Sequence, residues 1–117
     1  MSLVPDSRIR NVRIDEPTRT QIMAFLQGAV YSRIKAEPEF IFAAYDLMGG
    51  ANYDWHRTPL IALFNRHRNK GHAKAVKAAG IDLGWLMKAV LRADRRDFSI
   101  THKRGKRGMV RAYQWIH

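Results

Sequence analysis

Two stretches with strand-like alternation close an otherwise helical sequence. Residues 97–101 (DFSIT) and 109–116 (MVRAYQWI) are rich in β-branched and aromatic residues, which is typical of strands. The segment between them, 102–108 (HKRGKRG), is basic and punctuated by glycine, so it predicts the tip of a hairpin. The sequence therefore predicts a mainly helical α+β fold that ends in a β-hairpin over about 97–116.

Four helices are predicted ahead of the hairpin, the first of them over about 16–36. Asp15 can cap this helix, and Pro17 fits its first turn, where no intrahelical donor is needed. The helix should end before Pro38. Its broad apolar stripe would serve the core of a monomer or the interface of a homodimer equally well, and it consists of Ile22, Phe25, Leu26, Ala29 and Val30.

The other three predicted helices are shorter. A threonine followed by a proline starts the second, over about 58–69. The third spans 72–79, with Lys74 and Lys77 facing outward. Gly80-Ile81-Asp82 is interpreted as a turn, after which Asp82 can cap a fourth helix over about 83–95.

A single domain over 1–117 accommodates these elements, as the length favours. Residues 1–14 show no helical period and predict a loose lead-in. Residues 15–55 supply the first helix and an aromatic segment, in which Phe40 to Phe42 could form a short strand before helical turns that end at Gly49-Gly50. This segment is interpreted as a satellite of the core. Residues 56–117 hold the basic helices and the hairpin.

The net charge lies in the second half of the chain. The sequence has 21 Lys and Arg against 10 Asp and Glu, a formal charge of +11. Residues 1–55 hold six basic and seven acidic side chains, whereas residues 56–117 hold fifteen basic and three acidic ones. Such a lopsided surface favours polyanions as partners, because neutralised phosphates release condensed counterions. The alternative is a solvated surface kept positive for solubility.

The predicted helix over 83–95 has two opposite faces when its residues are placed 100° apart. One face is apolar and should dock on the core, and it consists of Leu83, Leu86, Met87, Val90 and Ala93. The other carries a tryptophan among cations, namely Trp85, Lys88, Arg92, Arg95 and Arg96. Trp85 could stack on a base or sugar, or fill a gap against the N-terminal half.

The order of short helix, glycine turn, basic helix and basic hairpin resembles the winged helix-turn-helix superfamily. The resemblance covers residues 60–116. It is carried by small, glycine and apolar residues that let two helices pack across a tight turn, namely Ala75, Ala79, Gly80, Ile81, Leu83, Leu86 and Ala89.

This resemblance implies that the second helix enters the major groove of duplex DNA and that the hairpin, as a wing, lies on the flanking backbone or minor groove. Lys88 and Arg92 would then face bases or phosphates, and Arg95 and Arg96 would point toward the backbone. The wing would contribute Lys103, Arg104, Lys106 and Arg107.

A second register of the same resemblance is open. Phe42 to Met48 and Thr58 to Asn69 could form the helix pair, with 72–95 as an insertion before the wing. Asn65, Arg66 and Asn69 would then face the ligand. The later pair is preferred because it directly precedes the hairpin and carries more cations.

The sequence gives little support for catalysis or a cofactor. It has no cysteine, and His67 and His72 are not on one helical face, so no metal site is predicted. His67 shares a face with Leu60 and Phe64 and is interpreted as a partly buried core histidine. No phosphate-binding loop, paired carboxylates or zinc motif is present. The least implausible nuclease residues, Asp46, Asp54 and His56, lack a third carboxylate, so we expect a protein that is not an enzyme.

The favoured hypothesis is a small cytoplasmic protein, associated with the nucleoid if bacterial, that binds duplex DNA as a regulator or architectural factor. Its size and charge would suit a phage or mobile element. An alternative is an RNA-binding or ribonucleoprotein-assembly module that uses Trp85, Tyr113 or Trp115 as stacking platforms. A second alternative is a module whose basic face meets an acidic protein. No apolar run is long enough for a membrane span, so no membrane partner is expected.

Overall fold

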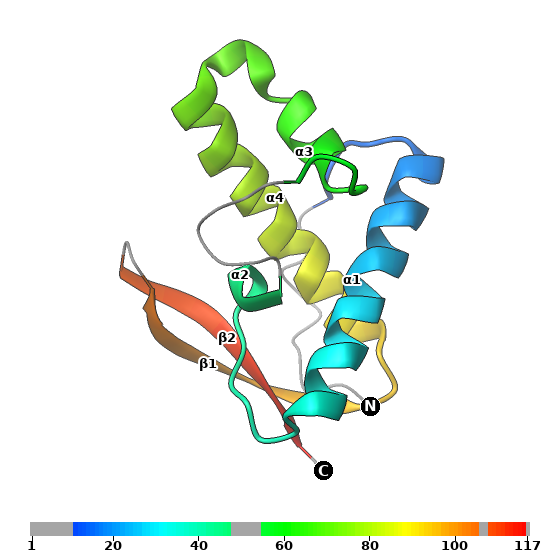
Figure 1. Ribbon diagram of the computed structural model, residues 1–117, viewed down its shortest axis with the longest axis vertical. Coiled ribbons are helices and arrows are strands. Elements are labelled where there is room, and N and C mark those ends of the chain that lie inside the picture. The colour runs from blue at the N-terminus through cyan, green and yellow to red at the C-terminus, as the bar shows by residue number, and fades with distance from the viewer. Residues whose placement is uncertain (1–10, 48–54, 106–107, 117) are drawn as a thin grey trace.

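The computed structural model describes residues 11–47, 55–105 and 108–116 of the chain. Within these ranges the helical elements precede a two-stranded antiparallel sheet (Figure 1). The elements are α1 (Glu16–Ala36), α2 (Ala44–Leu47), α3 (Ile61–Asn65), the 3₁₀-helix η1 (Arg68–Lys70), α4 (His72–Ala93), β1 (Asp97–Gly105) and β2 (Gly108–Ile116). The predicted α+β class with a C-terminal hairpin is confirmed.

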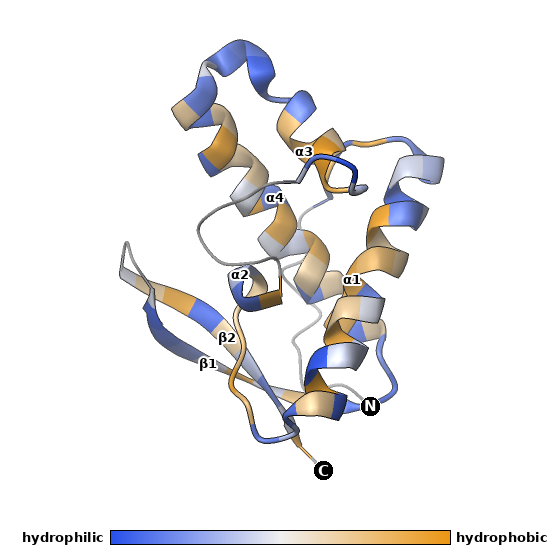
Figure 2. Ribbon diagram, viewed as in Figure 1, coloured by the Kyte–Doolittle hydropathy of each residue, from blue (hydrophilic) through white to orange (hydrophobic). Residues whose placement is uncertain are grey.

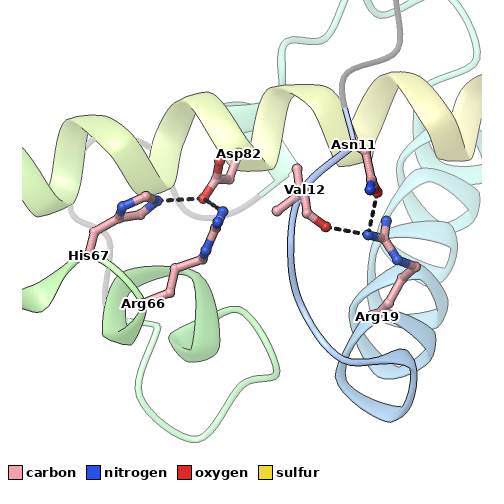
Figure 3. Close-up of polar contacts among 6 residues, drawn as sticks. All are labelled: Asn11, Val12, Arg19, Arg66, His67 and Asp82. Carbon is pink, nitrogen blue, oxygen red and sulfur yellow. Dashed lines mark hydrogen bonds and ion pairs between the residues drawn. The ribbon is translucent and has the colours of Figure 1, made fainter.

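Helix α1 has the predicted bounds. The side chain of Asp15 accepts a hydrogen bond from the Thr18 amide at 2.9 Å, and Pro17 lies in the first turn. Every third or fourth residue along one face is buried, namely Ile22, Leu26, Val30 and Ile34. This face packs on α4. In the segment before α1, Val12 is also buried, and Arg19 donates hydrogen bonds to the side chain of Asn11 and the carbonyl of Val12 (Figure 3).

The predicted helix over 58–69 is shorter than expected and interrupted. Thr58 accepts a hydrogen bond from the Leu60 amide, but the α-helical turns begin only at Ile61 and end at Asn65. A 3₁₀ turn, η1, then leads to Gly71, whose φ of 90° lies in the left-handed region that favours glycine. This sharp change of direction lets α3 fold back onto α4.

The predicted turn at Gly80-Ile81-Asp82 is wrong, because residues 72–93 form one continuous helix. The buried residues of α4 keep an unbroken helical spacing through this point, namely Ala75, Ala79, Leu83, Leu86 and Val90. A turn would have rotated Leu83 away from the face that buries Ala79. The separate helices predicted over 72–79 and 83–95 are therefore a single element, which ends at Ala93.

Asp82 does not cap a helix but joins α4 to the segment ahead of it. Its Oδ2 atom accepts a hydrogen bond from Nη1 of Arg66 at 2.8 Å and lies 2.7 Å from Nε2 of His67 (Figure 3). The imidazole of His67 is 11% exposed. The predicted partial burial of His67 is therefore confirmed, with a carboxylate as its partner.

Two glycines inside α4 give a test of its continuity. A Cβ atom added at Gly80 or Gly84 would meet no atom within 4 Å. Each Gly→Ala substitution should therefore raise the free energy of unfolding by about 0.5–1 kcal/mol, because alanine loses less backbone entropy in a helix. Urea denaturation measures this change. Unchanged or lower stability in both variants would contradict a helix through residues 80–84.

The hairpin joins a third extended segment at one point. β1 and β2 pair in antiparallel register, and Phe42 forms an isolated bridge with Tyr113 on the other edge of β2. β2 therefore lies between β1 and Phe42, which confirms an extended Phe42 ahead of the helical turn α2. The rings of Phe42 and Phe98 meet edge to face with their centroids 6.1 Å apart. This contact anchors the hairpin in the core.

The buried apolar side chains of α1, α4, the hairpin and the segments between them form a single hydrophobic cluster. Figure 2 shows the complementary pattern, with hydrophilic residues gathered where η1 meets α4 and along the hairpin. None of the helices in the described ranges is long and apolar enough to cross a lipid bilayer.

Candidate nucleic-acid interface

One face of α4 points away from the core, and its first half is exposed. Successive residues of an α-helix are rotated by about 100° about its axis. The side chains of this face, from Lys74 to Arg92, therefore lie within a sector about 100° wide. Lys74, Lys77, Ile81 and Gly84 are exposed, and we refer to these four residues as the basic face of α4. Ile81 is 50% exposed between the two lysines and Gly84. This face combines two cations with accessible apolar surface.

A second exposed surface lies on the half of the hairpin nearest its tip. The strand register pairs His102 with Arg111 and Arg104 with Met109, and directly paired residues share one face of a sheet. All four side chains are exposed, Met109 by 62%. We refer to them as the distal hairpin face. This face again places arginines beside an apolar side chain.

A pocket connects the two surfaces. It has a volume of about 170 Å³ and lies between α2, α4 and β2. Ile81 and Gly84 from the basic face of α4 and Arg111 from the distal hairpin face contribute to its wall, which also includes Ala44, Trp85, Met87 and Tyr113. Burial raises the pKa of Tyr113, so its phenol stays protonated at neutral pH. The two surfaces are thus neighbours rather than separate patches.

The acidic side chains of the helices around this pocket are already paired. Asp46 is the acid of α2, and its Oδ2 atom lies 2.6 Å from Nζ of Lys103. Asp82 is the acid of α4 and contacts Arg66 and His67. Because neither carboxylate is left unneutralised, the lysines and arginines of the two faces set the sign of the local field.

The sequence predicted that Trp85 and Lys88 lie together on an exposed binding face. The structure does not show such a face. Lys88 is only 3% exposed, and its ammonium lies 5.8 Å from the centre of the Trp85 ring. The prediction that Lys88 lies on an exposed face of the helix is therefore wrong, although Arg92, one turn further along the same side of α4, is exposed. Trp85 is half-buried, packs against the core and lines the pocket, so its predicted packing role is confirmed and its stacking on a base stays a prediction.

The arginines at the end of α4 lie far from the lysines at its start. Arg92 and Arg95 are exposed, but Lys74 and Arg92 are separated by roughly 27 Å along the helix axis. Arg96 is not available as predicted, because its guanidinium pairs with Asp94 at 2.8 Å and lies over the Tyr31 ring. Of the predicted cations at this end of the helix, Arg92 and Arg95 are therefore exposed, whereas Arg96 is held in an ion pair within the chain.

The pairing of Asp94 is reflected in its ionisation. Its carboxylate is 4% exposed. Burial would raise the pKa of Asp94, but hydrogen bonds from Arg96 and Gln27 outweigh it and hold the pKa below its ordinary value.

The predicted wing cations divide into different roles. Lys103 is engaged within the chain, since its ammonium pairs with Asp46, donates to the carbonyl of Ile41 at 3.0 Å and lies 4.8 Å from the centre of the Phe40 ring. It fixes the hairpin to the segment around α2. Arg104 is exposed as predicted. Lys106 and Arg107 lie outside the described residues.

Several residues of these two exposed faces were not among the predicted binding residues. Lys74 and Lys77 were predicted to face outward, which their exposure confirms, but not to belong to the site. Arg111 and Met109 were counted only as strand residues. Two signals could have found them: the unbroken apolar spacing of α4, and the alternation of β2, which puts Arg111 and Met109 on one face.

The residues of the alternative register are on the surface as well. Asn65, Arg66 and Asn69 are exposed, but Arg66 pairs with Asp82 and the side chain of Asn65 accepts a hydrogen bond from Arg68. These polar contacts stabilise the link from α3 to α4.

No metal-binding cluster is found among the described residues. In residues 11–47, 55–105 and 108–116, no three His, Cys, Asp or Glu side chains come close enough to hold a metal ion. The sequence offered Asp46, Asp54 and His56 as the least implausible residues for a nuclease. Asp46 forms an ion pair with Lys103, and Asp54 lies outside the described ranges.

The contrast between Lys88 and Arg92 gives a direct test of the orientation of α4. Lys88→Ala should lower the free energy of unfolding by about 1–3 kcal/mol, because it removes a buried side chain. Arg92→Ala, at an exposed position, should change it by no more than about 0.5 kcal/mol. Thermal and urea denaturation measure both. Equal stability of the two variants would contradict the burial of Lys88.

No family model matches the chain, and no curated protein or solved structure is significantly similar to it. Function must therefore be argued from the geometry and charge of the site itself.

Proposed function

We propose that this protein binds duplex DNA, without catalysing a reaction, as a regulator or architectural factor. The observation that carries the proposal is the meeting of the basic face of α4 and the distal hairpin face at one pocket. Together the two faces present Lys74, Lys77, Arg104 and Arg111, and the acids of α2 and α4 are already paired. Such a surface suits a ligand with regularly spaced negative charges.

The order of the elements supports a winged-helix arrangement. α1, the extended Phe42, α3 and α4 precede β1 and β2, and β2 lies between β1 and Phe42. In the winged helix-turn-helix superfamily the helix before the hairpin enters the major groove. We assign that role to α4. The part of α4 that contacts DNA in this proposal is its exposed first half, in place of residues 83–95.

In this arrangement α4 and the hairpin have distinct tasks. The major groove of B-DNA, about 12 Å wide, admits an α-helix. Lys74 and Lys77 would contact phosphates along the groove, while Arg104 and Arg111 would contact the adjoining backbone. Phosphate contacts fix the position of a protein on the duplex, and contacts to base edges give specificity.

Fluorescence anisotropy tests the proposal with labelled duplex DNA, single-stranded DNA and duplex RNA at about 50 and 200 mM salt. We expect duplex DNA to bind best, with affinity falling steeply as salt rises. Tighter binding to single strands or to RNA would instead support the RNA-binding alternative. No binding to any of the three would contradict the proposal and leave an acidic protein as the partner to test.

A further inference from the structure

The pocket between α2, α4 and β2 has features that phosphate binding alone does not require. Its wall is formed largely by apolar and aromatic side chains, including Ile81, Trp85 and Tyr113. A surface that only neutralises phosphates needs cations and no apolar recess. We propose that this pocket holds one unpaired pyrimidine base of the bound nucleic acid, so that the protein prefers a duplex with a single unpaired nucleotide over a fully matched one.

The size of the pocket matches a single aromatic ring. Its volume is about 170 Å³. An apolar cavity of about 150 Å³ in another protein admits a benzene ring. A pyrimidine has one six-membered ring of similar dimensions, whereas drug-sized ligands need pockets of roughly 300–1,000 Å³. The pocket, which is open to solvent on one side, therefore has room for one base.

The charges at the pocket identify the occupant as part of a polyanion. Arg111 belongs to the pocket wall, and His102 lies opposite it on β1. Lys77 precedes Ile81 by one helical turn on the basic face of α4. An apolar recess bordered by cations fits a nucleotide, whose base is largely apolar on its faces and whose phosphate is negative. An apolar side chain of a protein partner would not need these cations.

An aromatic side chain in the wall supplies the contact that a base requires. Trp85 is half-buried, so its position is set by packing against the core while part of its surface lines the pocket. Stacking on an aromatic side chain is worth roughly 5- to 150-fold in affinity per base. A base that is already unpaired reaches the pocket without the cost of breaking a base pair.

The inference rests on the proposed binding of duplex DNA. The following experiment tests duplex binding and insertion of an unpaired base separately. Affinities are measured for a matched duplex and for the same duplex with one unpaired thymine in its centre. We expect the second to bind at least about fivefold more tightly. Equal affinity for both would overturn the pocket assignment while leaving duplex binding intact. Binding of neither duplex would overturn both.

A substitution that fills the pocket provides the second measurement. Gly84 lines the pocket, is exposed, and has no atom within 4 Å of an added Cβ, so the backbone at this position accepts a side chain, and Gly84→Leu is the variant chosen. This variant should lose the preference for the unpaired thymine. Gly28→Leu is the matched control, because Gly28 is an equally unobstructed and exposed glycine of α1. It should keep the full preference. A preference that persists in Gly84→Leu would show that the unpaired base binds elsewhere and would overturn the proposal.

Discussion

Replacing Lys74, Lys77, Arg104 and Arg111 together by alanine is expected to weaken duplex DNA binding on the order of 10²-fold at low salt. All four side chains are exposed, so the variant should remain folded. Each lost phosphate contact lowers the log–log salt slope by about 0.9 units, so four contacts account for a slope of roughly 3.6. Raising the salt from about 50 to 200 mM should therefore weaken DNA binding by the variant about 10²-fold less than it weakens binding by the wild-type protein. Anisotropy titrations at several salt concentrations measure both quantities.

A control with the same charge change distinguishes a located interface from a general effect of charge. Arg13, Lys35, Arg92 and Arg95 are exposed and lie outside the basic face of α4 and the distal hairpin face. Their combined replacement by alanine also removes four positive charges. We expect this variant to keep most of its affinity and salt slope. If it loses as much as the first, the net charge and not the two faces would explain binding.

Ile81→Pro is expected to unfold the protein or to lower its free energy of unfolding by about 3 kcal/mol or more. Proline in a helix interior removes a backbone hydrogen bond and clashes with the preceding turn. Ile81 is 50% exposed, so the loss of its side chain contributes little. Since native domains are stable by only about 5–15 kcal/mol, the effect should be large. Urea denaturation followed by circular dichroism measures it.

The same substitution separates the continuous helix from the turn that the sequence suggested. A turn at residues 80–82 would accept proline just before the helix it starts, with little loss of stability. Ile81→Ala removes the side chain but leaves the backbone free to stay helical, so it should cost much less than the proline. Similar stabilities for Ile81→Pro and Ile81→Ala would contradict an uninterrupted α4.

The elements predicted correctly are those with local signals at their ends. Asp15, Pro17 and Pro38 determine where α1 begins and ends, and all three act through neighbouring backbone. The hairpin lies over the predicted residues, but β1 continues to Gly105, so residues 102–105, which the sequence placed in the tip, belong to the strand. At residues 80–82, glycine and aspartate suggested a turn, yet burial of Ala79 and Leu83 on one face keeps the helix intact. Packing against α1 and α3 prevailed over the local signal.

The positive charge of the candidate site could be predicted from the sequence, but the residues that form the site could not. The excess of cations after residue 55 is visible in the sequence. Which of them remain available depends on partners that are distant along the chain, such as Asp46 for Lys103. Lys88 was assigned to a surface because its helical angle is opposite the core, and a helical wheel does not show what covers that side. The burial of Lys88 becomes visible only in the three-dimensional structure, in which its ammonium lies 5.8 Å from the centre of the Trp85 ring.

The unbroken course of α4 also sets a fixed separation within the molecule. A helix of 22 residues is about 33 Å long. Its first turns carry the exposed lysines, and just beyond its last turn Asp94 accepts hydrogen bonds from Gln27 of α1 and from Arg96. The lysines at one end and the contact between Arg96 and Tyr31 at the other are therefore held a full helix length apart by one continuous element.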